Sequence, residues 1–202
     1  MASGAELFGR FKDLTDSEYY IFNDTTRADR LMSLAYRNSA EKLLRMAPYG
    51  KEVVRELRHL FKSQITATPT SNAVLLSAFT GTMFWVAFVK AKFTVSGVEY
   101  YYEATPDYFR LNRFLDAPDI RHPGYRIVGD SIVVSPSNVS CTQITADYYA
   151  KPANIDTTSA TDLGFDPVLD DLIVREAVVI ATSPNRDTLM NQLSLQEQIR
   201  NN

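Results

Sequence analysis

Apolar residues near the start of the chain recur every three or four positions in three stretches. This spacing places one side of a helix against a core, so the pattern predicts three amphipathic helices. The second helix follows capping residues at 23–26, and Pro48 marks its end. The expected buried faces are Leu7, Phe8, Phe11 and Leu14, then Ala28, Leu31, Met32 and Ala35, then Val53, Val54, Leu57, Leu60 and Phe61.

The pattern changes after the stretch TATPTSN, residues 66–72. From there to about Pro152 the chain is rich in β-branched and aromatic residues, many of them alternating with polar ones, which predicts strands. Ser96-Gly97 is a candidate tight turn that joins the run 84–95 to the run 98–103. We therefore expect a β-rich segment in the middle of the chain.

A second tight turn lies in the stretch GYRIVGDSIVVSP, residues 124–136. Glycine at the first central position of Gly129-Asp130 suits a type II′ turn, whose twist matches that of the flanking strands. In the resulting hairpin Ile127 lies opposite Ile132 and Tyr125 opposite Val134, all on one face.

The helical pattern returns near the end of the chain. Asp166 followed by Pro167 is typical of a helix N-terminus. A second, polar helix is expected after the stretch TSPNRD. The stripe expected to be buried in the first of these helices is Val168, Leu169, Leu172, Ile173, Ala177 and Ile180.

The order of elements predicts an α+β fold class. The N- and C-terminal helices form a helical bundle, and a small antiparallel β domain is inserted between them. The expected parts are residues 1–65 for the N-terminal helices, 66–155 for the β-rich domain, and 156–202 for the C-terminal helices that complete the bundle.

Composition excludes several classes of protein. The net charge of the 202 residues is −3, so no basic field favours nucleic acid or an anionic membrane. No apolar run approaches the ~20 residues of a transmembrane helix, and the first residues lack the pattern of a secretory signal. The lone Cys141 forms no disulfide within these residues, which fits a reducing compartment.

Recognised catalytic motifs are absent from the sequence. It contains no glycine-rich phosphate loop, G-x-S-x-G, CxxC pair or H-E-x-x-H. The two histidines, His59 and His122, fall in different predicted parts, and neither has a second metal ligand nearby in the sequence. We therefore expect no enzyme activity, no metal and no cofactor.

Four acidic residues near the start of the C-terminal helices have two interpretations. They are Asp162, Asp166, Asp170 and Asp171. Such a group can bind a divalent cation or supply a pair of catalytic carboxylates. Acids at a helix start also complement the helix dipole, and Asp166 is placed to cap it, so the structural interpretation is favoured.

Two further groups have ordinary structural interpretations. The arginines of the second and third predicted helices are interleaved with acids, which favours an ion-paired surface over a nucleic-acid face. The run Tyr100–Tyr102 is more typical of a strand than of a stacking platform for bases.

Three stretches resemble the head-to-tail connector proteins (adaptor, neck or ring proteins) of tailed bacteriophages, including those of crAss-like phages. The first is ELFGRFKDLTDSEYYIFNDTTRADRLMSLAYR, a helix, an aromatic connection and a second helix. The second runs from YFRLNRFLDAP to DYYAKP, with Pro123, Tyr125, Pro136, Tyr148 or Tyr149, and Pro152 at the positions of the connector pattern. The third, FDPVLDDLIVREAVVIATSPNRDTLMNQLSLQEQ, resembles the closing helices.

The resemblance implies a virion protein made in the host cytoplasm and located at the neck between capsid and tail. It implies a ring of twelve copies beneath the portal protein, bound also to a further neck or tail protein, with no membrane contact. Double-stranded DNA would pass through the ring without specific binding, to which mild acidity is suited. Residues expected to bind partners are Tyr125 and Asp130 in the hairpin, and Leu189, Leu193, Leu195 and Ile199 in a tail that docks on the portal.

Alternatives to an adaptor remain open. A head-completion stopper or a tail terminator is the nearest, and a stopper differs because it binds only after the adaptor is in place. A hydrolase that uses the four aspartates belongs to a different class of protein. A nucleic-acid regulator would require DNA binding with a steep salt dependence.

Overall fold

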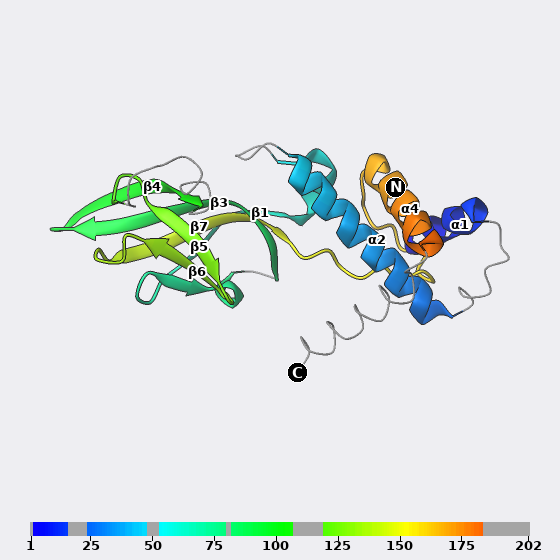
Figure 1. Ribbon diagram of the computed structural model, residues 1–202, viewed down its shortest axis with the longest axis horizontal. Helices are drawn as coiled ribbons and strands as arrows, with labels where there is room; N and C mark the ends of the chain where they lie inside the picture. The colour runs from blue at the N-terminus through cyan, green and yellow to red at the C-terminus, as the bar shows by residue number, and fades with distance from the viewer. Residues whose placement is uncertain (1, 16–23, 48–52, 80–81, 107–118, 184–202) are drawn as a thin grey trace. The chain divides into compact units, whose positions relative to one another are not determined.

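The computed structural model describes residues 2–15, 24–47, 53–79, 82–106 and 119–183 (Figure 1). The chain forms two compact units, and each is described by itself. The helical unit comprises residues 1–47, 54–59 and 152–202, and the β unit comprises residues 48–53 and 60–151. Each unit buries its own set of apolar side chains.

The first helix of the helical unit, α1 (Gly4–Leu14), begins with a capping box. The Glu6 N–H donates to Ser3 Oγ at 3.2 Å, and the Ser3 N–H donates to a Glu6 carboxylate oxygen at 2.8 Å. These two bonds satisfy backbone donors that a helix start leaves open. Leu7 and Phe11 are fully buried, which confirms the predicted helix and its core face, whereas Leu14 at the last turn is 64% exposed.

Helices α2 (Thr25–Met46) and α4 (Pro167–Thr182) pack against each other. Both begin at an aspartate cap: Asp24 accepts from Thr26 N, and Asp166 accepts from Val168 N at 3.0 Å, as predicted for Asp166. The predicted buried face of α2 is confirmed in full. The α4 stripe is wrong at Val168, which is 54% exposed, whereas the next residue of the same turn, Leu169, is fully buried.

The predicted third helix is replaced by other structure. Residues Arg55–Leu60 form a short 3₁₀ helix, η2, and Phe61 begins a strand. Leu57 and Leu60 are buried as expected, but Phe61 pairs with Tyr149 across two strands. The apolar spacing was compatible with a helix, and a strand partner distant in the sequence decided otherwise.

The strands of the described residues form one curled sheet of seven, in the order β1-β7-β3-β4-β5-β6-β2. All neighbouring pairs are antiparallel except β4 and β5, which are parallel over two residue pairs. The 3₁₀ helix η3 (Leu76–Ala78) follows β2. The strands are β1 (Phe61–Ala67), β2 (Ala73–Leu75), β3 (Met83–Val95), β4 (Val98–Pro106), β5 (Gly124–Val128), β6 (Ser131–Ser135) and β7 (Cys141–Ala150).

The predicted fold class is therefore wrong. The protein is a mixed α/β fold with a seven-stranded curled sheet, and not a helical bundle that carries a small antiparallel β domain. The sequence pattern located most strands but did not indicate that they join into one sheet. It also missed β1 and the parallel contact of β4 with β5, because pairing between distant strands leaves no local signal.

Both predicted hairpins are confirmed. Ser96 and Gly97 have φ angles of 50° and 79°, as a type I′ turn between β3 and β4 requires. In the second hairpin Tyr125 pairs with Val134 and Ile127 with Ile132, which is the predicted register. Gly129 has a φ of 55°, the left-handed region that glycine adopts without strain.

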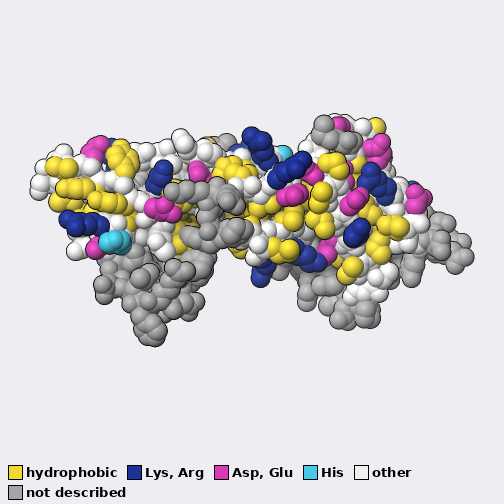
Figure 2. Space-filling view, turned by 90° about the horizontal axis from the view of Figure 1, so that it is seen from above, with side chains coloured by type: hydrophobic (Ala, Val, Ile, Leu, Met, Phe, Trp, Pro, Cys, Tyr) yellow, Lys and Arg dark blue, Asp and Glu magenta, His cyan; other side chains and the backbone are white. Residues whose placement is uncertain are grey.

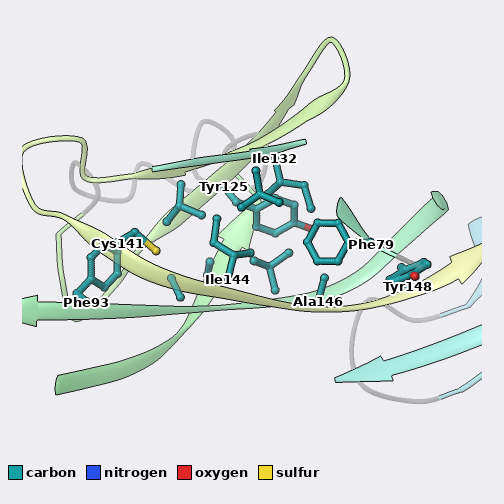
Figure 3. Packing of buried hydrophobic residues seen from close by; sticks show 13 residues of the cluster. Phe79, Phe93, Tyr125, Ile132, Cys141, Ile144, Ala146 and Tyr148 are labelled. Atoms are coloured by element: carbon teal, nitrogen blue, oxygen red, sulfur yellow. The ribbon is translucent and has the colours of Figure 1, made fainter. Parts of the chain in front are cut away.

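The core of the β unit lies between the curled strands (Figure 3). Tyr125 and Ile132 point from the second hairpin toward Ile144 and Ala146 of β7. Phe79, which follows η3, meets Tyr148 edge-on at a ring distance of 6.0 Å. The second hairpin is thus anchored by its inner face to the longest strands of the sheet.

Candidate functional surfaces

Three large apolar side chains are exposed where β5, β6 and β2 lie together. Leu75, Ile127 and Val128 have exposed fractions of 59%, 52% and 52%. Val128 of β5 and Leu75 of β2 both pair with Ser131 of β6, which lies between them. The side chains of paired residues point to the same face of a sheet, so Val128 and Leu75 share one face. Ile127 pairs with the buried Ile132 on the opposite face, which is the face of the core, but is itself half exposed to solvent. We call these three residues the hairpin surface.

The hairpin surface is exposed although water favours burying such side chains. Figure 2 shows one face of the molecule, on which hydrophobic side chains are interspersed with charged ones. Contiguous exposed apolar side chains are a common mark of a protein–protein contact, and here Leu75 and Val128 share one face of the sheet while Ile127 lies on the other. The strands that carry the hairpin surface are firmly held, because Val74 and Ile132 in the next row of the sheet are buried in the core.

Asn72 fixes β2 and β6 to the start of β7. Its side-chain amide donates to the carbonyl oxygens of Pro136 at 2.9 Å and Val139 at 2.7 Å, and its Oδ1 accepts from Cys141 N at 2.8 Å. Its own carbonyl accepts from Val134 N. Asn72 is 5% exposed and has a φ of 61°, a conformation that asparagine tolerates better than most residues.

The predicted partner-binding residues lie in different surroundings. Tyr125 is 5% exposed and belongs to the core, so it supports the hairpin from inside. Asp130 lies in the turn, where its carbonyl oxygen accepts from Leu76 N at 2.7 Å. The tail residues Leu189, Leu193, Leu195 and Ile199 lie outside the described residues. Binding by these six residues stays a prediction.

The tyrosine run lies on β4, as predicted, with its members on opposite faces. Tyr100 and Tyr102 stack on the core side, with ring centroids 6.3 Å apart and an interplanar angle of 10°. Tyr101 is 58% exposed on the other side. Lys92 lies over the Tyr101 ring at 5.1 Å and bonds to Glu99 at 2.6 Å, and both partners raise the pKa of Lys92.

Three of the four aspartates serve separate structural purposes. Asp162 accepts from Gly164 N, Asp166 caps α4 and pairs with Arg55 at 3.6 Å, and Asp171 pairs with Arg10 at 3.3 Å.

Asp170 is the exception, because it is 2% exposed and its Oδ1 has no hydrogen-bond partner. Burial raises the pKa of Asp170 above its ordinary value. No group of three or more histidine, cysteine or acidic side chains suited to a metal occurs within the described part of the chain.

His59 is exposed, but it contacts two aromatic side chains of the helical unit. Its Nε2 lies 2.5 Å from the hydroxyl of Tyr36, a fully buried residue of α2, and its ring packs on Phe165 at 5.1 Å. Burial lowers the pKa of His59 and raises that of Tyr36, so the pair is neutral near pH 7. This contact holds η2 against the helices. His122 is exposed and pairs with Asp119.

Arginines of α2 take part in ion pairs, as the interleaved acids indicated. Arg45 pairs with Glu41 and Arg27 with Asp24, both along the same helix. Asp29, also expected in such a pair, instead accepts from the backbone and hydroxyl of Thr157. No helix of the described residues is long and apolar enough to cross a membrane.

The chain matches no protein-family model and no curated protein sequence. Two important residues were missed by sequence reasoning. Leu75 joins the hairpin surface only through the register of β2 on β6, which no local pattern indicates. Asn72 follows Ser71 in a polar break, and a Ser-Asn pair before a strand is a usable turn signal.

Proposed function

We propose that this chain is a structural virion protein, a head-to-tail connector that forms a ring beneath the portal and extends the DNA channel toward the tail. Its partners are the portal protein, a further neck or tail protein and other copies of itself, and it is located in the virion neck. The observation that supports this best is the hairpin surface. It offers exposed apolar side chains on a rigid support, which suits assembly better than catalysis.

The energy available from this surface suits an assembly contact. Leu75, Ile127 and Val128 are each about half exposed. Apolar surface removed from water stabilises by roughly 25 cal/mol per Å². Burying the exposed half of each side chain in an interface therefore contributes about 1 kcal/mol. About 3 kcal/mol per copy is weak for an isolated pair of molecules, but a closed ring repeats the contact at every interface.

The charge of the chain is consistent with a channel that does not bind DNA. The net charge is −3, and several basic side chains of the described residues already have acidic partners. Specific or tight DNA binding requires a field of unpaired lysines and arginines. We therefore propose that the DNA duplex passes through the ring without being bound.

The first test is antibody-gold labelling of particles purified from the source. Label at a single vertex, between head and tail, is expected. Absence of the protein from particles would overturn the proposal. Binding of the purified chain to the purified portal protein then separates an adaptor from a stopper, because a stopper binds only after the adaptor is present.

A pair of variants tests the role of the hairpin surface. Leu75→Asp combined with Val128→Asp places two charges on exposed positions and should prevent incorporation into particles while the protein still folds. Ser77→Asp combined with Asn138→Asp adds the same charge at exposed positions outside the surface, and should leave incorporation normal. Equal incorporation of both double variants would show that the hairpin surface is not a contact in the particle.

A further inference from the structure

We propose that the outer edge of β4, from Val98 to Tyr102, is a docking site for an extended segment of a partner protein that adds to the sheet as a further strand. We call this segment the β4 edge. The inference rests on backbone geometry and does not depend on the proposed connector function.

The β4 edge is open although β4 is an inner strand in the order of the sheet. Its antiparallel pairing with β3 runs from Val98 to Ala104, but its parallel pairing with β5 involves only Thr105 and Pro106. Between Val98 and Tyr102, therefore, no strand of the described residues lies on the side away from β3. An open edge of this kind presents unpaired backbone donors and acceptors.

The hairpin geometry shows which backbone groups point outward. The two-residue turn makes Val95 and Val98 a hydrogen-bonded pair, so Tyr100 and Tyr102 also bond to β3. Glu99 and Tyr101 then direct their N–H and C=O groups to the open side. Thr105 continues the same series, and its N–H donates outward to Pro123 O at 2.9 Å. Glu99 and Tyr101 have no such backbone bond among the described residues.

The two end strands of the sheet are irregular or short, and β4 is neither. In β1, Gln64 forms a bulge with a φ of 54° and turns its N–H to Asp147 Oδ1 at 2.6 Å. In the short strand β2, both backbone groups of Ala73 are bonded to Thr70. Bulges and short, covered strands are the usual means by which proteins prevent strand addition. The β4 edge has no bulge and no proline before Pro106.

The side chains of the β4 edge indicate the chemistry of the partner. A strand beside β4 places its side chains about 5 Å from those of β4, on both faces. On the outer face Glu99 pairs with Lys92 through Oε1 at 2.6 Å and is still half exposed, so a lysine or arginine opposite it can share the carboxylate. On the core face the stacked rings of Tyr100 and Tyr102 favour β-branched or aliphatic side chains. The expected partner segment alternates basic and β-branched residues.

A second copy of the chain fits this edge less well. Two β4 strands that pair antiparallel about Tyr101 would bring Glu99 of each copy opposite Glu103 of the other. Like charges directly opposite each other destabilise a strand pair. The acidic positions of the β4 edge therefore favour a basic segment from another protein.

Amide hydrogen exchange of the full chain, measured by NMR, tests the proposal with the peptide acetyl-(Lys-Val)4-amide as the probe. In the free chain the amides of Glu99 and Tyr101 should exchange rapidly, and those of Tyr100 and Tyr102 slowly. Saturating peptide should slow Glu99 and Tyr101 at least tenfold. The matched acidic peptide acetyl-(Glu-Val)4-amide should bind at least tenfold more weakly.

Two substitutions make the test specific. Tyr101→Pro removes an outward N–H but no bond to β3, and should abolish binding, whereas Tyr101→Val keeps the N–H and should bind within about threefold of the wild type. Should Tyr101→Pro fail to fold, Glu99→Lys leaves the backbone intact and should reverse the preference to the acidic peptide.

Three results would overturn the proposal. One is that the peptide leaves the Glu99 and Tyr101 amides unprotected. Another is that these amides are already slow in the dilute free chain, which would show that its own residues cover the edge. The third is protection that rises with protein concentration, which would show that a second copy is the occupant.

Discussion

Replacing Asn72 by alanine should destabilise the β unit more than any change at a surface position. The side chain makes three hydrogen bonds to backbone groups of Pro136, Val139 and Cys141, at 2.7 to 2.9 Å. Pro136 and Val139 lie in the connection between β6 and β7, and Cys141 is the first residue of β7. Alanine leaves all three without their partner, in a place where water has little access.

The expected loss of unfolding free energy is about 3 kcal/mol. This value is near the lower end of the sum of the contributions from the three hydrogen bonds and the backbone conformation. Each hydrogen bond contributes about 0.5–1.5 kcal/mol net, and a buried group left unsatisfied costs about 1–3 kcal/mol. The φ of 61° adds about 1 kcal/mol for an alanine in the left-handed region. Partial exposure of the loop that carries the two carbonyls lowers the total, because water can replace some of the lost donors.

Urea unfolding followed by the fluorescence of Trp85 is the suitable assay. Trp85 is the single tryptophan of the chain and lies on β3, so its signal reports on the β unit. With a denaturant slope of about 1–3 kcal/mol per M, Asn72→Ala should lower the urea midpoint by roughly 1–3 M.

Two companion variants separate the contributions. Asn72→Gly removes the backbone strain but not the loss of hydrogen bonds, and should recover only about 1 kcal/mol of the effect. Asn72→Asp keeps the acceptor for Cys141 but turns a carboxylate oxygen toward two carbonyl oxygens. The folded state then favours the protonated acid, so this variant should lose stability as pH rises above about 4. A loss below about 1 kcal/mol for both the alanine and glycine variants would refute the role assigned to the network.

Two titratable groups of the helical unit give further predictions. Burial lowers the pKa of His59, so the unfolded chain takes up a proton first and the unit should lose stability as pH falls below about 6.5. Thermal unfolding by far-UV circular dichroism at pH 7.5 and 5.5 should show this loss in the wild type and a smaller one in His59→Gln; equal losses would contradict it. Burial raises the pKa of Asp170, so the wild type should lose stability relative to Asp170→Asn as pH rises above the ordinary value near 4. Parallel stability curves for these two proteins from pH 4 to 8 would show that the buried carboxyl carries no such penalty.

Local features of the fold could be predicted because their causes lie within a few residues. The register of the second hairpin follows from the position of Gly129, since a two-residue turn fixes every pair beyond it. The start of α4 follows from Asp166 and Pro167, where the cap and the fixed φ of proline act on the first turn alone.

The sequence-based predictions were wrong where contacts with residues far apart in the chain determine the structure of a segment. Phe61 fits a helical stripe as well as a strand, and Tyr149 on β7 decided in favour of the strand. His59 and Tyr36 form a hydrogen bond although 23 residues separate them. The hairpin surface needs the register of β2 on β6, and the β4 edge exists because β5 begins only opposite Thr105, near the end of β4.

The sequence by itself determined the helix starts, the tight turns, the alternation of the strands and the absence of recognised catalytic motifs. Each depends on side-chain and backbone preferences that act over a turn of helix or a hairpin. The tertiary structure alone decided that seven strands join one curled sheet, which edge of that sheet stays open, and which apolar side chains remain in water. Those outcomes depend on pairings between segments far apart in the chain, which are selected by how well whole faces pack and not by any local pattern.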